Sequence, residues 1–346
     1  MNSTWLAGLG VMSTALVAAG SASAHGDVDK PEKADAQVGV AASAEAGAPV
    51  EGGDEKAEHE HEEEKGMVGL DLVLGWGKVP FAVQNLPTAS NPSITYTRAD
   101  KTSSNVQSFI ALGSLEVTEH VGLELRVPFT FAGFSPNGSA ARSTTGFGNV
   151  EVAGEYETSI TKGLHFVGAL GVALPTAVGD EIPPDLANAS AGSVDATAFD
   201  RWSLSRAAAS ARGYEDNALF EPHRLGIIPK VGVVYRLRGF SVEPYVKVEN
   251  LVATSTALEQ KYVGELVGGL RVGYWVHKQF ELGVKGWVNV GYAGSDEDKQ
   301  TAVAIEPQVV LKFGPVRPYA GVIVPVAGPP SDNGFVGVRL GAAAAF

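Results

Sequence analysis

The sequence predicts an all-β fold, a closed antiparallel transmembrane β-barrel of about 12 strands with long external loops. Apolar and polar residues alternate along most of residues 67–346, which is the period of a β-strand. The predicted strands exceed the ~5–6 residues usual in soluble sheets and fit the ~9–11 residues of a tilted membrane strand. Short and long connections also alternate along the chain, as in membrane-spanning barrels.

Residues 1–24 have the features of a cleaved signal peptide. An apolar stretch from Trp5 to Gly20 precedes the small residues Ser21 to Ala24, after which a signal peptidase would cut. No Lys or Arg precedes this stretch, which departs from the usual pattern. A membrane anchor is the alternative, but 16 residues fall short of the ~20 that a spanning helix needs. We therefore expect an exported protein.

Residues 25–66 are predicted to be an acidic, His-containing, disordered periplasmic segment. They hold 13 Asp and Glu against four Lys, which accounts for −9 of the net charge of −13. His59 and His61, with His25, are candidates for a divalent-metal site built from imidazole and carboxylate groups. A spacer without metal, extended by its own charge repulsion, is the alternative that the composition favours.

Composition and motifs exclude several classes of function. Residues 67–346 are nearly neutral, so no basic surface is present for nucleic acid. The chain has no cysteine, which excludes thiol catalysis, zinc-thiolate sites and disulfides. No Gly-x-Ser-x-Gly or other nucleophile motif occurs. We predict no catalytic residues, no cofactor and no enzyme activity.

The alternation is clearest at residues 279–293, where Leu282 and Val284 fall on one face and Glu281 and Lys285 on the other. Twelve strands would return both termini to the short-turn, periplasmic side of an outer membrane. The predicted strands lie at about 67–78, 104–117, 119–131, 147–159, 163–176, 224–238, 240–252, 262–277, 279–293, 301–313, 315–326 and 334–346.

The predicted long connections are 79–103, 132–146, 177–223, 253–261, 294–300 and 327–333. The longest, 177–223, exceeds a simple connection and is expected to have a role of its own. Within it, Asp200 to Arg212 predict a short Ala-rich helix with Asp200 as N-cap. The loop either folds into the barrel mouth as a constriction or stays solvated outside, and the sequence leaves both open.

Aromatic residues indicate that the apolar face contacts lipid, because those predicted to point outward gather in two belts. Two such belts are the expected anchors at the two water interfaces of a membrane barrel. The belt at the short-turn end contains Tyr156, Tyr235, Phe240, Tyr274, Phe280, Phe313 and Phe346, and the other contains Trp76, Phe129 and Tyr292.

The opposite face is charged and is predicted to line the lumen, because a wet lumen tolerates charges that hydrocarbon does not. These charges either form a selectivity lining or pair and fill a narrow interior, and both alternatives remain open. The candidates are Glu124, Arg126, Glu151, Glu155, Glu157, Lys230, Arg236, Glu243, Lys247, Glu249, Glu265, Arg271, Glu281, Lys285, Glu306, Lys312, Arg317 and Arg339, with Asp71, Glu116 and His165 on the same face.

The last predicted strand ends at Phe346 on its outward face. A terminal aromatic residue on such a strand resembles the assembly signal of outer-membrane barrels. This resemblance implies the barrel assembly machinery of the outer membrane as a partner, beside the lipid bilayer. Several prolines oppose the barrel, and the sequence offers no account of Pro229 and Pro307, which fall inside predicted strands.

One hairpin resembles a known family. Gly146-Phe147-Gly148-Asn149 leads into a strand that reaches Tyr156, and a Gly-rich strand ends at Pro175-Thr176. Outer-membrane barrels associated with the MetA pathway of phenol degradation share this pattern, with Asp at the position of Asn149 and Gly at that of Ala177. The resemblance covers about 30 residues and implies an envelope barrel that passes small, hydrophobic molecules.

These observations predict an outer-membrane transporter or channel for small solutes, hydrophobic or aromatic compounds included. A structural or envelope-interaction barrel, with an occluded lumen and no flux, is the alternative.

Overall fold

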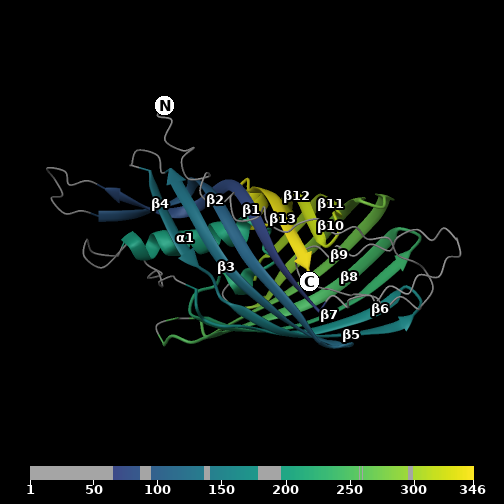
Figure 1. Ribbon diagram of the computed structural model, residues 1–346. Coiled ribbons are helices and arrows are strands. Elements are labelled where there is room, and N and C mark those ends of the chain that lie inside the picture. The colour runs from purple at the N-terminus through teal and green to yellow at the C-terminus, as the bar shows by residue number, and fades with distance from the viewer. Residues whose placement is uncertain are drawn as a thin grey trace, which may run out of the picture. The chain divides into compact units, whose positions relative to one another are not determined.

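The computed structural model describes residues 65–85, 95–135, 141–177, 196–256, 258, 260–294 and 299–346. They form a closed antiparallel barrel of 12 strands (Figure 1), in which pairing of β1 with β13 and of β2 with β3 completes the circle. The strands are β1 (Gly66–Asn85), β2 (Thr95–Thr118), β3 (Val121–Ser135), β4 (Arg142–Phe147), β5 (Glu151–Thr161), β6 (Leu164–Ala173), β7 (Arg224–Leu237), β8 (Phe240–Ala253), β9 (Tyr262–His277), β10 (Phe280–Ala293), β11 (Thr301–Leu311), β12 (Val316–Ala327) and β13 (Val336–Ala345).

β4 and β5 together make one barrel strand. β4 pairs with the end of β3 at Phe129–Phe134, and β5 pairs with its beginning at Val121–Arg126. Residues 148–150 separate them and have no place in either ladder. The predicted strand 147–159 is thus present but interrupted, and it begins earlier, at Arg142.

The prediction of a closed 12-stranded antiparallel barrel is confirmed. The largest differences in strand boundaries are at β1 and β2, which continue as a paired ribbon through much of the predicted loop 79–103. Brief turns join the strands at one end, which we call the short-turn end, and at the other, the long-loop end, lie the longer connections. The short turns are 119–120, 162–163, 238–239, 278–279 and 312–315.

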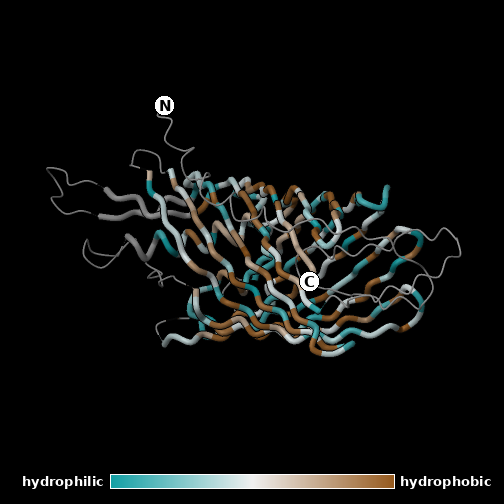
Figure 2. The backbone as a smooth tube through the Cα atoms, viewed as in Figure 1, coloured by the Kyte–Doolittle hydropathy of each residue, from teal (hydrophilic) through white to brown (hydrophobic). Residues whose placement is uncertain are grey.

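The two faces of the barrel differ as the alternation predicts. Hydrophobic and hydrophilic residues alternate along the strands in Figure 2. The outer surface exposes large apolar side chains such as Leu282 and Val284, while Glu281 and Lys285 of the same strand are buried inside. Of the predicted belts, Phe346 is the most exposed, at 64 %. Glu116, predicted inward, is exposed beside the 119–120 turn.

The two prolines that the sequence left unexplained interrupt the ladder on one side only. The pairing of β7 with β8 breaks off around Pro229, and that of β11 with β12 around Pro307, among the residues described. Each proline stays in register on its other side, where Pro229 faces Leu170 and Pro307 faces Val284. A missing N–H is therefore tolerated within closed strands at the cost of local pairing.

Three helices complete the described structure: α1 (Ala196–Ala211), the 3-10 turn η2 (Asn217–Leu219) and α2 (Pro329–Asp332). Among the described residues, no helix is both long and apolar enough to cross a membrane.

The outward face can be tested by its depth dependence. We expect Val284→Arg, in the body of β10, to lower the free energy of unfolding in lipid vesicles by about 2–4 kcal/mol. Val326→Arg, on an equally exposed site near the long-loop end of β12, should cost about 0–1 kcal/mol. Equal losses, measured by denaturant titration, would contradict a lipid-facing outer surface.

Candidate functional site

Residues 196–223, the described part of the connection that leads into β7, lie inside the barrel. We call residues 196–223 the plug. Its helix α1 packs against β1, β2, β3 and β4 (Figure 1). Leu204 and Ala211 belong to a buried apolar cluster with the inward-facing wall residues Val73 and Ile110. The described part of the predicted loop 177–223 is therefore folded into the lumen.

Small residues allow α1 to approach the wall closely. Ala207, Ala208 and Ala211 are almost completely buried. Opposite them, a Cβ atom at Gly75 would collide with the Cβ of Ala211, and one at Gly337 would lie 2.6 Å from the Ala211 carbonyl oxygen. The Ala-rich composition that predicted a helix also determines how deeply the helix sits.

The predicted helix is present, but its N-cap is wrong. Helix α1 begins at Ala196, so Asp200 lies inside it and forms an ion pair with Arg142 of β4 at 3.0 Å. The helix ends at Ala211, and Gly213, just beyond it, has a φ of +63°. The N–H of Tyr214 donates to the Ala209 carbonyl at 2.9 Å, and that of Gly213 to Ser210 at 3.0 Å. This Schellman ending turns the chain sharply.

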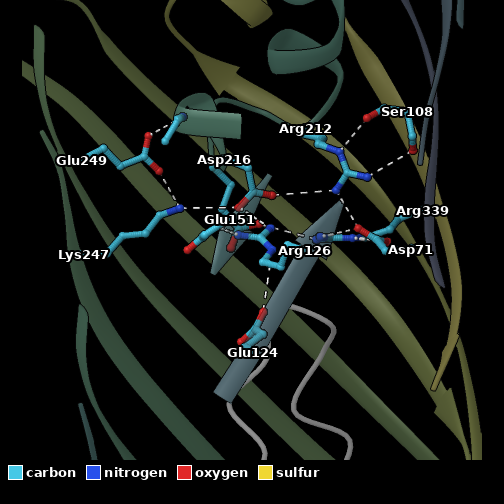
Figure 3. Close-up of polar contacts among 12 residues, drawn as sticks. Asp71, Ser108, Glu124, Arg126, Glu151, Arg212, Asp216, Lys247, Glu249 and Arg339 are labelled. Atoms are coloured by element: carbon cyan, nitrogen blue, oxygen red, sulfur yellow. Dashed lines mark hydrogen bonds and ion pairs between the residues drawn. The ribbon is translucent and has the colours of Figure 1, made fainter. Parts of the chain in front are cut away.

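The turn after α1 places Arg212, 1 % exposed, against the wall. Its Nη1 donates to Asp71 Oδ2 at 2.6 Å, and its Nε and Nη2 donate to Ser108 Oγ and its carbonyl at 3.0 and 3.1 Å (Figure 3). Asp71 also accepts two hydrogen bonds from Arg339 at 2.9 and 3.0 Å, and one from Tyr319 at 2.9 Å. One carboxylate of β1 thus binds both the plug and β13.

Farther along the plug, Glu215 and Asp216 are acids that pair with basic residues of the barrel wall. Asp216 Oδ1 lies 3.0 Å from Arg126 Nη2 and 3.5 Å from Lys247 Nζ. Glu215 pairs with Lys285 and lies 3.5 Å from Arg339 Nη1. Opposite charges within the closely packed interior offset the cost of removing these groups from water. The tip of the plug is therefore held by ion pairs with β3, β8, β10 and β13.

Amide side chains complete the attachment. Asn149, at the interruption between β4 and β5, donates from Nδ2 to the carbonyls of Ala218 at 2.8 Å and Glu221 at 2.7 Å. Its Oδ1 accepts from the Ala177 N–H, and its own N–H donates to the Leu219 carbonyl. The strand is interrupted here because residue 149 bonds to the plug instead of β3.

The predicted lumen residues fall into two groups. Those around the plug contact it directly or through one partner: Arg126, Glu151, Lys247, Glu249, Glu265, Lys285, Glu306 and Arg339. Those nearer the short-turn end are buried or half-buried and include the Arg271 pairs with Glu243 and Glu281: Glu124, Glu155, Glu157, Lys230, Arg236, Glu243, Arg271, Glu281, Lys312 and Arg317.

The plug residues Arg212, Glu215 and Asp216 were not among the predicted site residues. A charged run inside an otherwise Ala-rich loop was the signal for them. The predicted metal candidates His59 and His61 lie outside the described residues. Within the described part of the chain, no group of His, Asp and Glu residues is arranged to hold a metal ion.

Two cavities lie between the plug and the short-turn end. One has a volume of about 60 Å³ and extends from Val167 to Arg339 across β6 to β13. The other, of about 30 Å³, lies on the side of β3 and β5 and includes Glu124, Glu151 and Glu155. Lys230 and Lys247 border both. The lumen below the plug therefore contains cavities lined by charged residues.

No protein-family model and no curated protein matches the chain. Among solved structures, an outer membrane channel from Pseudomonas putida F1 superposes with a TM-score of 0.54 at 11 % identity, over 85 % of this chain and 100 % of that one. The chain has an outer-membrane β-barrel fold. The KdgM porin is less similar, with a TM-score of 0.39, 9 % identity and coverage of 80 % and 99 %. The CymD monoaromatic hydrocarbon channel has a TM-score of 0.37, 10 % identity and coverage of 82 % and 89 %.

Removal of the shared carboxylate should weaken the plug more than removal of its arginine. We expect Asp71→Asn to cost about 3–5 kcal/mol of unfolding free energy, because it removes the carboxylate that the two buried arginines share and leaves Arg212 with only the more distant Asp216, at 3.8 Å. Arg212→Met leaves Asp71 paired with Arg339 and should cost about 1–3 kcal/mol. Denaturant unfolding in detergent measures both, with Glu116→Gln at the exposed turn as a control. An Arg212→Met loss above that of Asp71→Asn would contradict this.

Asn149→Asp replaces the amide by a carboxylate of nearly the same shape and should release the end of the plug. A carboxylate cannot donate to the Ala218 and Glu221 carbonyls, so two hydrogen bonds become repulsive contacts. We expect faster tryptic cleavage at Arg212 and Arg224 than in the native chain. Asn250→Asp, on β8, where the amide donates to the Ile227 carbonyl of β7 at 3.2 Å, is the matched control. Equal cleavage rates in the two variants would contradict a holding role for Asn149.

Proposed function

We propose that this protein is an outer-membrane channel for small solutes, in which the plug forms the constriction and the lumen charges set selectivity. The observation that supports it is the plug, a segment within the lumen attached by ion pairs and hydrogen bonds above two cavities. Charged linings of narrow pores select among solutes. The similar Pseudomonas barrel, itself described as a channel, is consistent with this function.

For the cargo, we propose small compounds with an apolar or aromatic part. Support comes from the hairpin that resembles the MetA-pathway barrels, Gly146 to Thr176. Apolar side chains also accompany the charges along the inner wall, among them Val167 and Val234.

A barrel without flux is the second candidate, and one observation favours it. On the side of β6 to β9, the plug residue Ala218 packs into a buried apolar cluster with Ala173, Ile228, Leu251 and Val263. Such contacts exclude water around the plug. A plug that never moves would make the protein a structural or envelope-interaction component.

We further propose that both termini of the barrel are periplasmic and that the last strand is recognised by the barrel assembly machinery. The N–H groups of Lys65 and Gly66 donate to the Phe346 carbonyl at 2.7 and 3.1 Å, so both ends of the barrel meet at the short-turn end. In outer-membrane barrels that end faces the periplasm. Residues 1–24 would then be the signal peptide and 25–66 a periplasmic segment.

A disulfide lock tests whether solutes pass by movement of the plug. A Cβ atom at Gly226 would lie 3.6 Å from that of Ala218, within the ~3.5–4.5 Å of disulfides. We expect oxidised Ala218→Cys/Gly226→Cys protein to show no channel openings in planar bilayers, and a reductant to restore the openings of the native chain.

The native chain has no cysteine, so the single variants Ala218→Cys and Gly226→Cys serve as controls. Their channel openings should not change when the reductant is added. Openings that persist in the oxidised double variant would contradict passage by plug movement. Complete absence of openings in the native protein would favour the barrel without flux.

A further inference from the structure

The larger cavity contains a buried hydrogen-bond donor without an acceptor. Gln308, on β11, is 7 % exposed, and its Nε2 finds no hydrogen-bond partner among the described residues. A buried amide N–H is costly unless an acceptor reaches it. Gln308 borders the larger cavity, so a group bound there would supply that acceptor.

The same wall carries an excess of positive charge. Five bases and three acids border the cavity, and each acid pairs with one of these bases. Lys247 is held by Asp216 and Glu249, which lie outside this wall. Lys230 is the remaining base of the five, and no ion pair with a described residue holds it. The pairs are Glu215 with Lys285, Glu243 with Arg271, and Glu306 with Arg339.

Lys230 forms no ion pair with any described residue, and its Nζ lies 5.6 Å from the centre of the Tyr245 ring. The Lys285 ammonium is also 5.6 Å from the centre of this ring and borders the same cavity. An ammonium beside an aromatic face stays attractive to anions, because the ring stabilises the cation without neutralising it. Tyr245 thus places an apolar surface next to the Lys230 ammonium, whose neighbouring acids, Glu124 and Glu155, border the adjoining cavity.

We propose that this cavity binds a small carboxylate with an apolar or aromatic body. Its carboxylate accepts from Lys230 and Gln308, and its body lies against Tyr245 and Val234. This inference rests on the proposed function, since the ligand is a solute held below the plug. It narrows that function from small solutes in general to amphiphilic organic anions.

The acids of the adjoining cavity determine which way the body of the bound ligand points. Across Lys230 lie Glu124, Glu151 and Glu155, which make the smaller cavity acidic. Like charges repel a carboxylate from that side. The ligand body therefore extends toward Tyr245 and away from β3 and β5.

Equilibrium dialysis of the full-length protein in detergent tests this with radiolabelled benzoate. We expect saturable benzoate binding, and none of comparable strength for the neutral analogue benzamide. Lys230→Gln should weaken it about tenfold or more, as expected for loss of a charge-assisted hydrogen bond. Lys230→Arg should retain it, and Gln308→Leu should weaken it about three- to tenfold.

Lys312→Gln, a lysine of the same barrel outside the cavity, is the control and should bind like the native chain. Equal binding of benzamide, or equal losses in the Lys230 and Lys312 variants, would overturn the site. Heat-modifiable gel mobility verifies folding, and the Gln308 variant tests the site separately should Lys230→Gln fail to fold. Bilayer recordings separate the two proposals: openings without benzoate binding overturn the site alone, and binding without openings overturns the channel alone.

Discussion

The rest of the structure depends on how Asp71 shares its carboxylate between two arginines. Asp71 lies on β1, Arg339 on β13 and Arg212 on the plug, and all three are buried. Because β1 and β13 are the strands whose pairing closes the barrel, this carboxylate spans the seam and the plug attachment at once. An unpaired carboxylate there would be very costly. Barrel closure and plug insertion are thereby linked through one charge.

The plug fits closely against the barrel wall because the residues at their contact are small. Gly75 and Gly337 make room for Ala211 on the side of β1 and β13. The Schellman ending at Gly213 then reverses the chain, which brings Glu215 and Asp216 to the bases of the opposite wall. Because the helix lies against β1 to β4, the larger cavity forms on the side of β6 to β13. The charged space available to a solute is therefore a consequence of where the helix ends.

The sequence predicts the barrel well because each strand has one face toward the outside and one toward the lumen. The alternation of apolar and polar residues distinguishes these two faces. It also identifies the wall charges, since any charge on that face must point inward. The plug could not be predicted in the same way, because its position depends on contacts such as Arg212 with Asp71, 141 residues apart. Asn149 is similar: alternation continues through it, and only its partner 69 residues away, Ala218, explains the interruption. The N-cap prediction at Asp200 was wrong because the helix begins earlier, at Ala196. The Asp200 carboxylate instead pairs with Arg142 of β4, a contact that is distant in sequence.

The chemistry of the attachment bears on whether a plug of this kind can move. Ion pairs inside a protein gain about as much from each other as they lose in desolvation, so their net stabilisation is small. If the plug left, water would enter the lumen and hydrate Asp71, Arg126 and Lys247, which would recover much of that desolvation cost. Apolar contacts such as those of Ala218 and Leu204 would gain nothing in return. The charged part of the attachment thus resists displacement into a wet lumen less than apolar contacts of equal area do, while its buried pairs still specify a single closed position.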